Sequence, residues 1–195
     1  KDRGLRASDP FDEVVVTSEI MEAGETATFE DITERAAERF APLVDLDVTK
    51  IATQFLEGTR VGATPVTRGV ALPHLRLPGI SRPFLVVARS RRGLDINVGD
   101  AMPSSTTHRN VHAVFFLISP TADPALHLRI LAQLAGCVEQ EGFQEEWISA
   151  RSHQALREVL LRDDRYLSLV LEPGSSAAAL AGKKIRDIGF PSGSL

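Results

Sequence analysis

The run Val111-His-Ala-Val-Phe-Phe-Leu-Ile118 is the longest strongly apolar stretch of the chain. It is far shorter than the roughly 20 residues that a helix needs to cross a bilayer, and it contains a histidine. Continuous apolar runs with β-branched and aromatic residues are typical of strands buried on both faces of a sheet. The sequence therefore predicts a buried strand here and no membrane span.

A helix is predicted shortly after this strand. The pair Asp123-Pro124 offers an N-cap followed by proline at the first helical position. Apolar residues then recur at helical spacing as far as Gly142, which is predicted to end the helix. Two shorter helices are predicted near residues 143–150 and 153–161.

Two amphipathic helices are predicted on the N-terminal side. The first begins after Thr28, a candidate N-cap, and ends near Pro42. The second begins after Asp47 and is predicted to stop at Gly58, because glycine commonly ends helices.

Two further buried strands are predicted, at residues 70–72 and 84–88. The polar excursion 93–110, which precedes the central run, is predicted to contain a hairpin or loop. Because helices come before, between and after the strands, the predicted fold class is α/β, with a mixed β-sheet sandwiched by helices.

Composition places the chain among globular proteins. Its 195 residues are 43% hydrophobic and 25% charged, which suffices for one sizeable core. The net charge of −4 provides no broad basic field, so neither nucleic acid nor an anionic membrane surface is expected as a partner. The single cysteine, Cys137, cannot form an internal disulfide and is expected to be a core residue in a reducing, cytoplasmic compartment.

Three segments are predicted. Residues 1–10 are charged, contain Pro and Gly, and begin with Lys rather than Met, which indicates a linker in a piece of a longer chain. Residues 11–164 form the main domain. Residues 165–195 are too few for a second core and are predicted to be a partial C-terminal appendage.

The segment Gly69-Val-Ala-Leu-Pro-His74 carries the most informative chemistry. A buried strand ends at a proline and brings a histidine to the sheet edge, where a rigid scaffold holds it while it stays accessible. Histidine suits reversible phosphoryl transfer because its ordinary pKa, near 6.5, leaves most of it neutral and nucleophilic at pH 7. From position alone, a loop histidine that only satisfies a carbonyl group is the commoner case.

His127 is the second candidate. It lies in the first turn of the helix that follows Pro124, where free amides and the helix dipole favour an anion by about 0.3–1 kcal/mol. It also shares a helix face with Ile130 and Leu134, and on such a face a hydrogen-bonded core histidine is the commoner case. Histidines at a strand end and a helix start are compatible with one shared anionic site.

No other constellation indicates a metal or cofactor. His108 and His112 are four residues apart, but the residues between them fit a loop entering a strand, and no cysteine or carboxylate pair completes a ligand set. Residues 58–62 lack the lysine and the spacing of a phosphate-binding P-loop. No metal and no cofactor is therefore expected.

Four stretches, in order along most of the chain, resemble the enzyme IIA domains of the fructose/mannitol (PtsN-like) class of the bacterial sugar phosphotransferase system. They are residues 55–64, 69–77, 111–120 and 124–132. The resemblance implies a mixed sheet sandwiched by helices. It further implies that His74 accepts a phosphoryl group from the carrier protein HPr or its paralogue, and that His127 lies against it.

One departure from the family pattern concerns charge at this site. Counting back from His74 without gaps, the family has an arginine where this chain has Gly58, with Arg60 two residues further on. A charge-assisted contact to a phosphoryl group is worth about 1.5–3 kcal/mol. Its loss is expected to slow transfer by roughly 10- to 150-fold unless Arg60 substitutes for it.

The tail resembles a second family. Residues 166–175 and 181–194 are similar to the first part of the TrkA-type C-terminal domain, which occurs in regulators of potassium transport and in other ion transporters. The pairing of the two modules implies the cytoplasmic part of a bacterial ion transporter, at the inner membrane, with the membrane domain in the same polypeptide. An ordinary tail packed on the main domain is the alternative.

The leading hypothesis is therefore a regulatory enzyme IIA-like domain of a membrane ion transporter, switched by phosphorylation of His74. The first alternative is a true phosphocarrier that passes phosphate from HPr to the IIB domain of a sugar permease. The second is a structural module that forms a homodimer and has lost phosphate chemistry.

Overall fold

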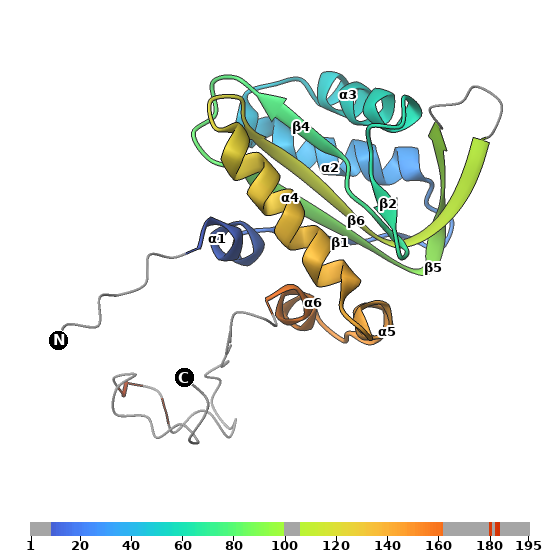
Figure 1. Ribbon diagram of the computed structural model, residues 1–195, viewed down its shortest axis with the longest axis vertical. Helices are drawn as coiled ribbons and strands as arrows, with labels where there is room; N and C mark the ends of the chain where they lie inside the picture. The colour runs from blue at the N-terminus through green and yellow to red at the C-terminus, as the bar shows by residue number, and fades with distance from the viewer. Residues whose placement is uncertain (1–8, 100–105, 162–179, 181, 184–195) are drawn as a thin grey trace.

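One mixed sheet lies between two layers of helices in the computed structural model, which describes residues 9–99, 106–161, 180, 182 and 183 (Figure 1). This arrangement confirms the predicted α/β class, a mixed sheet sandwiched by helices. Among the helices of these residues, none combines the length and the hydrophobicity that a bilayer-spanning segment requires.

The sheet is organised around β6 (Thr106–Pro120). On one side β6 runs antiparallel to β5 (Phe84–Gly99). Two short strands, β3 (Val70–Ala71) and β4 (His74–Leu77), run parallel to β6 at successive positions along it. Within residues 93–110, where a hairpin or loop is predicted, β5 and β6 continue past the rest of the sheet as a paired antiparallel arm, with an irregular register between Arg89 and Leu94.

Two more strands complete the sheet. β1 (Glu19–Glu22) runs parallel to β5, and β2 (Val66–Thr67) forms a tight antiparallel pair with β3. The order across the sheet is β1-β5-β6-β3-β2, with β4 also on β6.

Six helices in the described residues cover the two faces of the sheet (Figure 1). One face is covered by α2 and α3, and the other by α1, α4, α5 and α6. Their bounds are α1 Pro10–Val16, α2 Phe29–Val44, α3 Val48–Arg60, α4 Pro124–Glu139, α5 Phe143–Ser149 and α6 His153–Leu160.

Alternating side chains of the central strand divide the core in two. Phe115 and Leu117 enter the cluster beneath α1, α4, α5 and α6, whereas Val114, Phe116 and Ile118 enter the cluster beneath α2 and α3. Successive residues of a strand point to opposite faces, so a strand covered on both faces must be apolar throughout. This is why the run that begins at Val111 lacks polar alternation.

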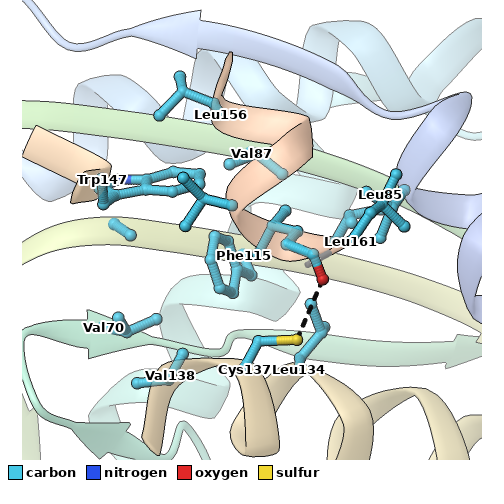
Figure 2. Close-up of a cluster of buried hydrophobic side chains, with 14 of the residues drawn as sticks. Val70, Leu85, Val87, Phe115, Leu134, Cys137, Val138, Trp147, Leu156 and Leu161 are labelled. Carbon is cyan, nitrogen blue, oxygen red and sulfur yellow. Dashed lines mark hydrogen bonds between the residues drawn. The ribbon is translucent and has the colours of Figure 1, made fainter. Parts of the chain in front are cut away.

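The first of these clusters contains the single cysteine (Figure 2). Cys137 is buried and its thiol donates to the carbonyl oxygen of Leu160, which joins α4 to α6. Trp147 is fully buried beside Phe115, with ring centroids 5.4 Å apart in an edge-on arrangement. Cys137 therefore has the core role that the sequence predicts.

The helix starts agree with the sequence, and two of the ends do not. Thr28, Asp47 and Asp123 each cap their helix through the side chain. The prediction that Gly58 stops α3 is wrong, because the helix continues to Arg60 and the left-handed turn is made by Gly62 (φ 77°).

The predicted stop of α4 at Gly142 is also displaced. α4 ends at Glu139, and Gly142 (φ 81°) instead forms the N-cap position of α5. Pro42 lies inside the last turn of α2, which ends at the left-handed Asp45 (φ 52°).

Several short elements are absent from the sequence prediction. α1 begins at Pro10, capped by Asp9, within what was expected to be the end of a linker. β1, β2 and β4 are also additions, because strands of two to four residues carry too little periodic pattern to be recognised. The predicted appendage at 165–195 lies outside the described residues, apart from positions 180, 182 and 183.

Arg89 on β5 is a buried charge that joins three elements. Its side chain is 2% exposed. The guanidinium donates to the carboxylate of Glu22 on β1 at 3.1 Å, and to the carbonyl oxygens of Trp147 at 3.2 Å and Ala150 at 2.6 Å, at the end of α5. Arginine suits this place because its planar group offers several donors in fixed directions.

We expect the Arg89→Met substitution to lower the free energy of unfolding by about 1.5–3 kcal/mol, since it removes charge-assisted hydrogen bonds to the half-exposed Glu22 and to the carbonyl oxygen of Trp147, while Ala150 still accepts from Arg91. Urea unfolding followed by circular dichroism measures this. Arg92→Met is the matched control, because Arg92 pairs with Glu25 where both side chains are exposed, and a change within about 1 kcal/mol is expected there. Equal effects of the two substitutions would contradict a structural role for Arg89.

Candidate functional site

His74 is held at the sheet edge by a break between two short strands. β3 ends before Pro73, and β4 begins at His74, opposite Leu117 of β6. The carbonyl oxygen of Pro73 accepts from the amide of Leu117 at 3.0 Å, so the chain stays attached to β6 through the break. The predicted placement of His74 at the edge is therefore observed, with the residue at the start of a further strand.

His127 reaches the same place from α4, the helix that follows β6 in the chain. The strand ends at Pro120, and the short link 121–123 leads to α4. Asp123 caps the helix by accepting from the amide of Leu126 at 2.9 Å. His127 follows in the first turn and is 5% exposed.

The two histidines lie against each other. Their ring centroids are 5.1 Å apart and their planes are inclined by 49°. Both rings border a depression of about 600 Å³, and its lining residues are His74, Leu75, Arg76, Thr121, Pro124, His127 and Leu128. The fold thus brings together the two residues that the sequence singled out, although they are far apart in the chain.

Both rings are anchored through Nδ1. His74 Nδ1 lies 3.0 Å from the carbonyl oxygen of Leu72, and His127 Nδ1 is hydrogen-bonded to the hydroxyl of Ser119. A carbonyl oxygen can only accept, so neutral His74 carries its proton on Nδ1 and has its lone pair on Nε2. The nucleophilic nitrogen of His74 is therefore Nε2.

The electrostatics of the site favour a neutral His127. Burial lowers the pKa of His127, and the charges of His74 and Arg76 lower it further. Among the lining residues Arg76 alone carries a permanent positive charge. Together with the amides at the start of α4, this cation provides donors for the oxygens of an anionic group.

Arg76, Ser119 and Thr121 are site residues that the sequence reasoning missed. One signal for Arg76 was available, because residues two apart on a strand share a face and His74 is two positions before it. No local signal pointed to Ser119, which approaches His127 only through the fold.

The sequence left open whether Arg60 replaces the arginine that is expected at position 58. Neither Gly58 nor Arg60 lines the depression. A Cβ placed on Gly58 would meet nothing within 4 Å, so a side chain has room there.

The other histidine pair considered in the sequence lies on β6. The backbone of His108 pairs with Asn97 in the arm, and His112 Nδ1 is hydrogen-bonded to the carbonyl oxygen of Ser90 at 3.0 Å. In the described residues no group of three or more His, Cys, Asp or Glu side chains could hold a metal ion.

Comparison with known proteins places this geometry in a family. Residues 25–163 match the family described as phosphoenolpyruvate-dependent sugar phosphotransferase system, EIIA 2. The chain belongs to this family. Its EIIA domain spans most of the sheet and both helical layers, and it includes His74 and His127.

The chain is similar to two relatives in sequence and to a third in structure. A nitrogen regulatory protein of Bradyrhizobium diazoefficiens is 27% identical over 151 residues, which cover 77% of this chain and 94% of that protein. The fructose-specific EIIA component of Haloferax volcanii is 30% identical over 105 residues, 54% of this chain and 64% of that protein.

The third relative is a solved structure, the nitrogen regulatory protein IIA-Ntr of Neisseria meningitidis. It superposes with a TM-score of 0.65 and 20% identity, over 78% of this chain and 99% of that one. At this identity the match supports the fold alone, and the fold is the same mixed sheet flanked by helices.

We expect His127 to titrate below 6.5, with a midpoint that rises in Arg76→Gln because one neighbouring positive charge is removed. Ring NMR shifts recorded against pH measure both midpoints. Arg60→Gln is the control, because Arg60 lies outside the depression and its loss should leave the midpoint in place.

The lowered pKa of His127 makes the stability of the folded chain depend on pH. The pKa of His127 is lower in the folded than in the unfolded chain, so the unfolded chain takes up this proton first. The contribution of His127 to the free energy of unfolding is complete above about pH 6.5 and declines as the pH falls below that value. A His127 midpoint at or above 6.5 would contradict both expectations.

Proposed function

We propose that this chain is a regulatory EIIA domain in which Nε2 of His74 accepts a phosphoryl group from an HPr-type carrier. The single observation that carries the proposal is the anchored histidine pair. Nδ1 of His74 is fixed by a backbone carbonyl, and its ring borders a depression shared with His127 and Arg76. A half-buried nucleophile with donors around it is what reversible phosphoryl transfer requires.

The step itself needs no general base. The lone pair on Nε2 of His74 forms the new nitrogen–phosphorus bond, and the donor nitrogen keeps the electron pair of the bond that breaks. Nδ1 keeps its proton and its hydrogen bond to Leu72, so the phosphorylated ring is an imidazolium held by a carbonyl oxygen. Arg76 offsets the charge of the phosphoryl oxygens.

A switch accounts for the site better than a high-flux carrier. The family arginine position holds Gly58, and the nearby Arg60 lies outside the depression. Slow transfer is a handicap for sugar uptake, but it is compatible with a signal that only needs to be set and read. The likeness to the nitrogen regulatory protein of Bradyrhizobium diazoefficiens favours the same interpretation.

The partner we propose is the membrane domain of an ion transporter in the same polypeptide, with this domain on the cytoplasmic face. The support is the resemblance of residues 166–175 and 181–194 to a TrkA-type C-terminal domain. Phosphorylation of His74 adds about −1.5 to −2 charges at the depression, which shifts a docking equilibrium with the membrane domain.

Two alternatives make different demands on the site. A phosphocarrier for a sugar permease, suggested by the fructose-specific relative, requires rapid exchange with a IIB domain. A structural homodimer module without phosphate chemistry would be favoured by a His74 covered by its neighbours. The ring of His74 is instead only half-buried and borders the open depression.

Incubation with phosphoenolpyruvate, enzyme I and HPr is expected to add one phosphate to the chain, and His74→Ala is expected to abolish this. Intact-mass spectrometry under alkaline conditions detects the acid-labile phosphohistidine. His153→Ala is the control, because His153 is a well-exposed histidine of α6 and lies outside the depression. Labelling that survives in His74→Ala would refute the proposed acceptor.

Restoring the family arginine is expected to accelerate transfer. In Gly58→Arg the new Cβ meets no atom within 4 Å in the last turns of α3, and the initial rate of phosphorylation by phospho-HPr should rise by roughly 10- to 150-fold. Gly136→Arg is the matched control, since it adds the same charge at an equally open glycine of α4. Equal rates in the two variants would show that the missing arginine does not limit transfer.

The transporter proposal is tested on the native protein reconstituted in lipid vesicles. Potassium flux is followed with a fluorescent indicator. The flux is expected to change when phospho-HPr is added on the side of the membrane that carries this domain. In His74→Ala the flux should no longer respond to phospho-HPr. Flux that is indifferent to both treatments would remove the regulatory role while leaving phosphorylation of His74 untouched.

A further inference from the structure

The two site histidines are anchored through the same ring nitrogen but by chemically different partners. Leu72 presents a carbonyl oxygen to Nδ1 of His74, and that oxygen can only accept. Ser119 presents a hydroxyl to Nδ1 of His127, and a hydroxyl can either donate or accept. The tautomer of His74 is therefore dictated by the backbone, whereas the tautomer of His127 depends on the direction of one hydrogen bond.

Burial decides that direction. Ser119 lies on β6 with no exposed surface, and His127 is 5% exposed. In the described part of the chain, Nδ1 of His127 is the single hydrogen-bond partner of the Ser119 hydroxyl. If Nδ1 carried the proton, the hydroxyl proton of Ser119 would be buried without an acceptor, which is the costly arrangement for a polar group.

We propose that Ser119 is a positioning residue whose hydroxyl donates to Nδ1 of His127 and thereby holds His127 with its proton on Nε2. The neutral ring then offers an N–H group to an anion bound at the depression. This inference rests on the proposed function and deepens it, because the anion it serves is the phosphoryl group on His74.

The arrangement makes the two rings complementary. His74 has a lone pair on Nε2 and His127 has a proton on Nε2, while the ring centroids are 5.1 Å apart. The opposite tautomer of His127 would turn a lone pair toward the phosphoryl oxygens and repel them. Fixing a ring through the hydrogen bond on its other nitrogen is the general way in which proteins set histidine tautomers.

The position of Ser119 follows from the sheet register. In the parallel pairing of β4 with β6, Ser119 lies opposite Arg76, two residues beyond the pair of His74 with Leu117. The same register that brings His74 to the depression therefore places the hydroxyl under α4, where His127 meets it. Burial and the neighbouring charges lower the pKa of His127, which favours the neutral ring that the scheme requires, and the hydrogen bond from Ser119 then selects the tautomer.

The first test uses the whole chain labelled with ¹⁵N histidine at pH 8, where long-range ¹H–¹⁵N spectra distinguish the two tautomers. We expect the Nδ1–H pattern for His74 and the Nε2–H pattern for His127. In Ser119→Ala the His127 signals should move toward a mixture of tautomers, and in Ser119→Thr, which keeps the hydroxyl, they should return. Thermal unfolding of each variant verifies that it is folded.

Ser18→Ala is the matched control. Ser18 is also a buried serine, and its hydroxyl donates to the carbonyl oxygen of Val15 at 2.7 Å, away from the depression. Its removal should leave the His127 tautomer unchanged. A wild-type His127 with the proton on Nδ1, or a pattern that stays the same in Ser119→Ala, would overturn the inference.

The second test measures transfer from phospho-HPr. Loss of one ordinary hydrogen bond is expected to slow phosphorylation of His74 in Ser119→Ala by roughly 2- to 13-fold, with recovery in Ser119→Thr and no change in Ser18→Ala. Rates equal to wild type in Ser119→Ala would overturn the positioning role. If the wild type takes up no phosphate, the proposed function fails, and the tautomer spectra still decide the role of Ser119.

Discussion

The pairing of β6 with its neighbours along both edges is the constraint on which the rest of the structure depends. One edge is occupied by β5 and the other by β3 and then β4, and the side chains of β6 are buried on both faces of the sheet, each beneath a layer of helices. Burial on both faces explains the continuous apolar run and the two separate clusters of the core. Once β6 is fixed, its neighbours have little freedom in register.

The candidate site is a by-product of how this central strand ends. β4 joins the last residues of β6 and carries His74, while the chain leaves β6 at Pro120 and returns at once as α4 with His127. Each histidine is thus placed by an element that is anchored to the same few residues. Rigid placement by strand register and helix capping lets two rings meet within 5.1 Å without a loop having to close over them.

The chemistry of the site depends on partners of different kinds. A backbone carbonyl fixes the tautomer of neutral His74, burial and neighbouring positive charge lower the pKa of His127, and Arg76 lines the depression with a permanent positive charge. Membership of the EIIA family defines the kind of domain. The absence of the family arginine at Gly58 is the feature that separates a slow regulatory switch from a rapid carrier in this interpretation.

Much of the fold and the two histidines could be predicted from the sequence, because the signals concerned are local. Caps such as Thr28 and Asp123 act on amides three residues away, and helical or continuous apolar periodicity is visible in neighbouring residues. Only the tertiary structure decided the two-residue strands, the continuation of α3 past Gly58, and the contacts of Ser119 and Arg76 with the histidines. The short strands and the contact of Ser119 with His127 depend on residues distant in the chain, through strand pairing and burial, so local patterns do not encode them, whereas the spacing of Arg76 from His74 is the one local signal among these features.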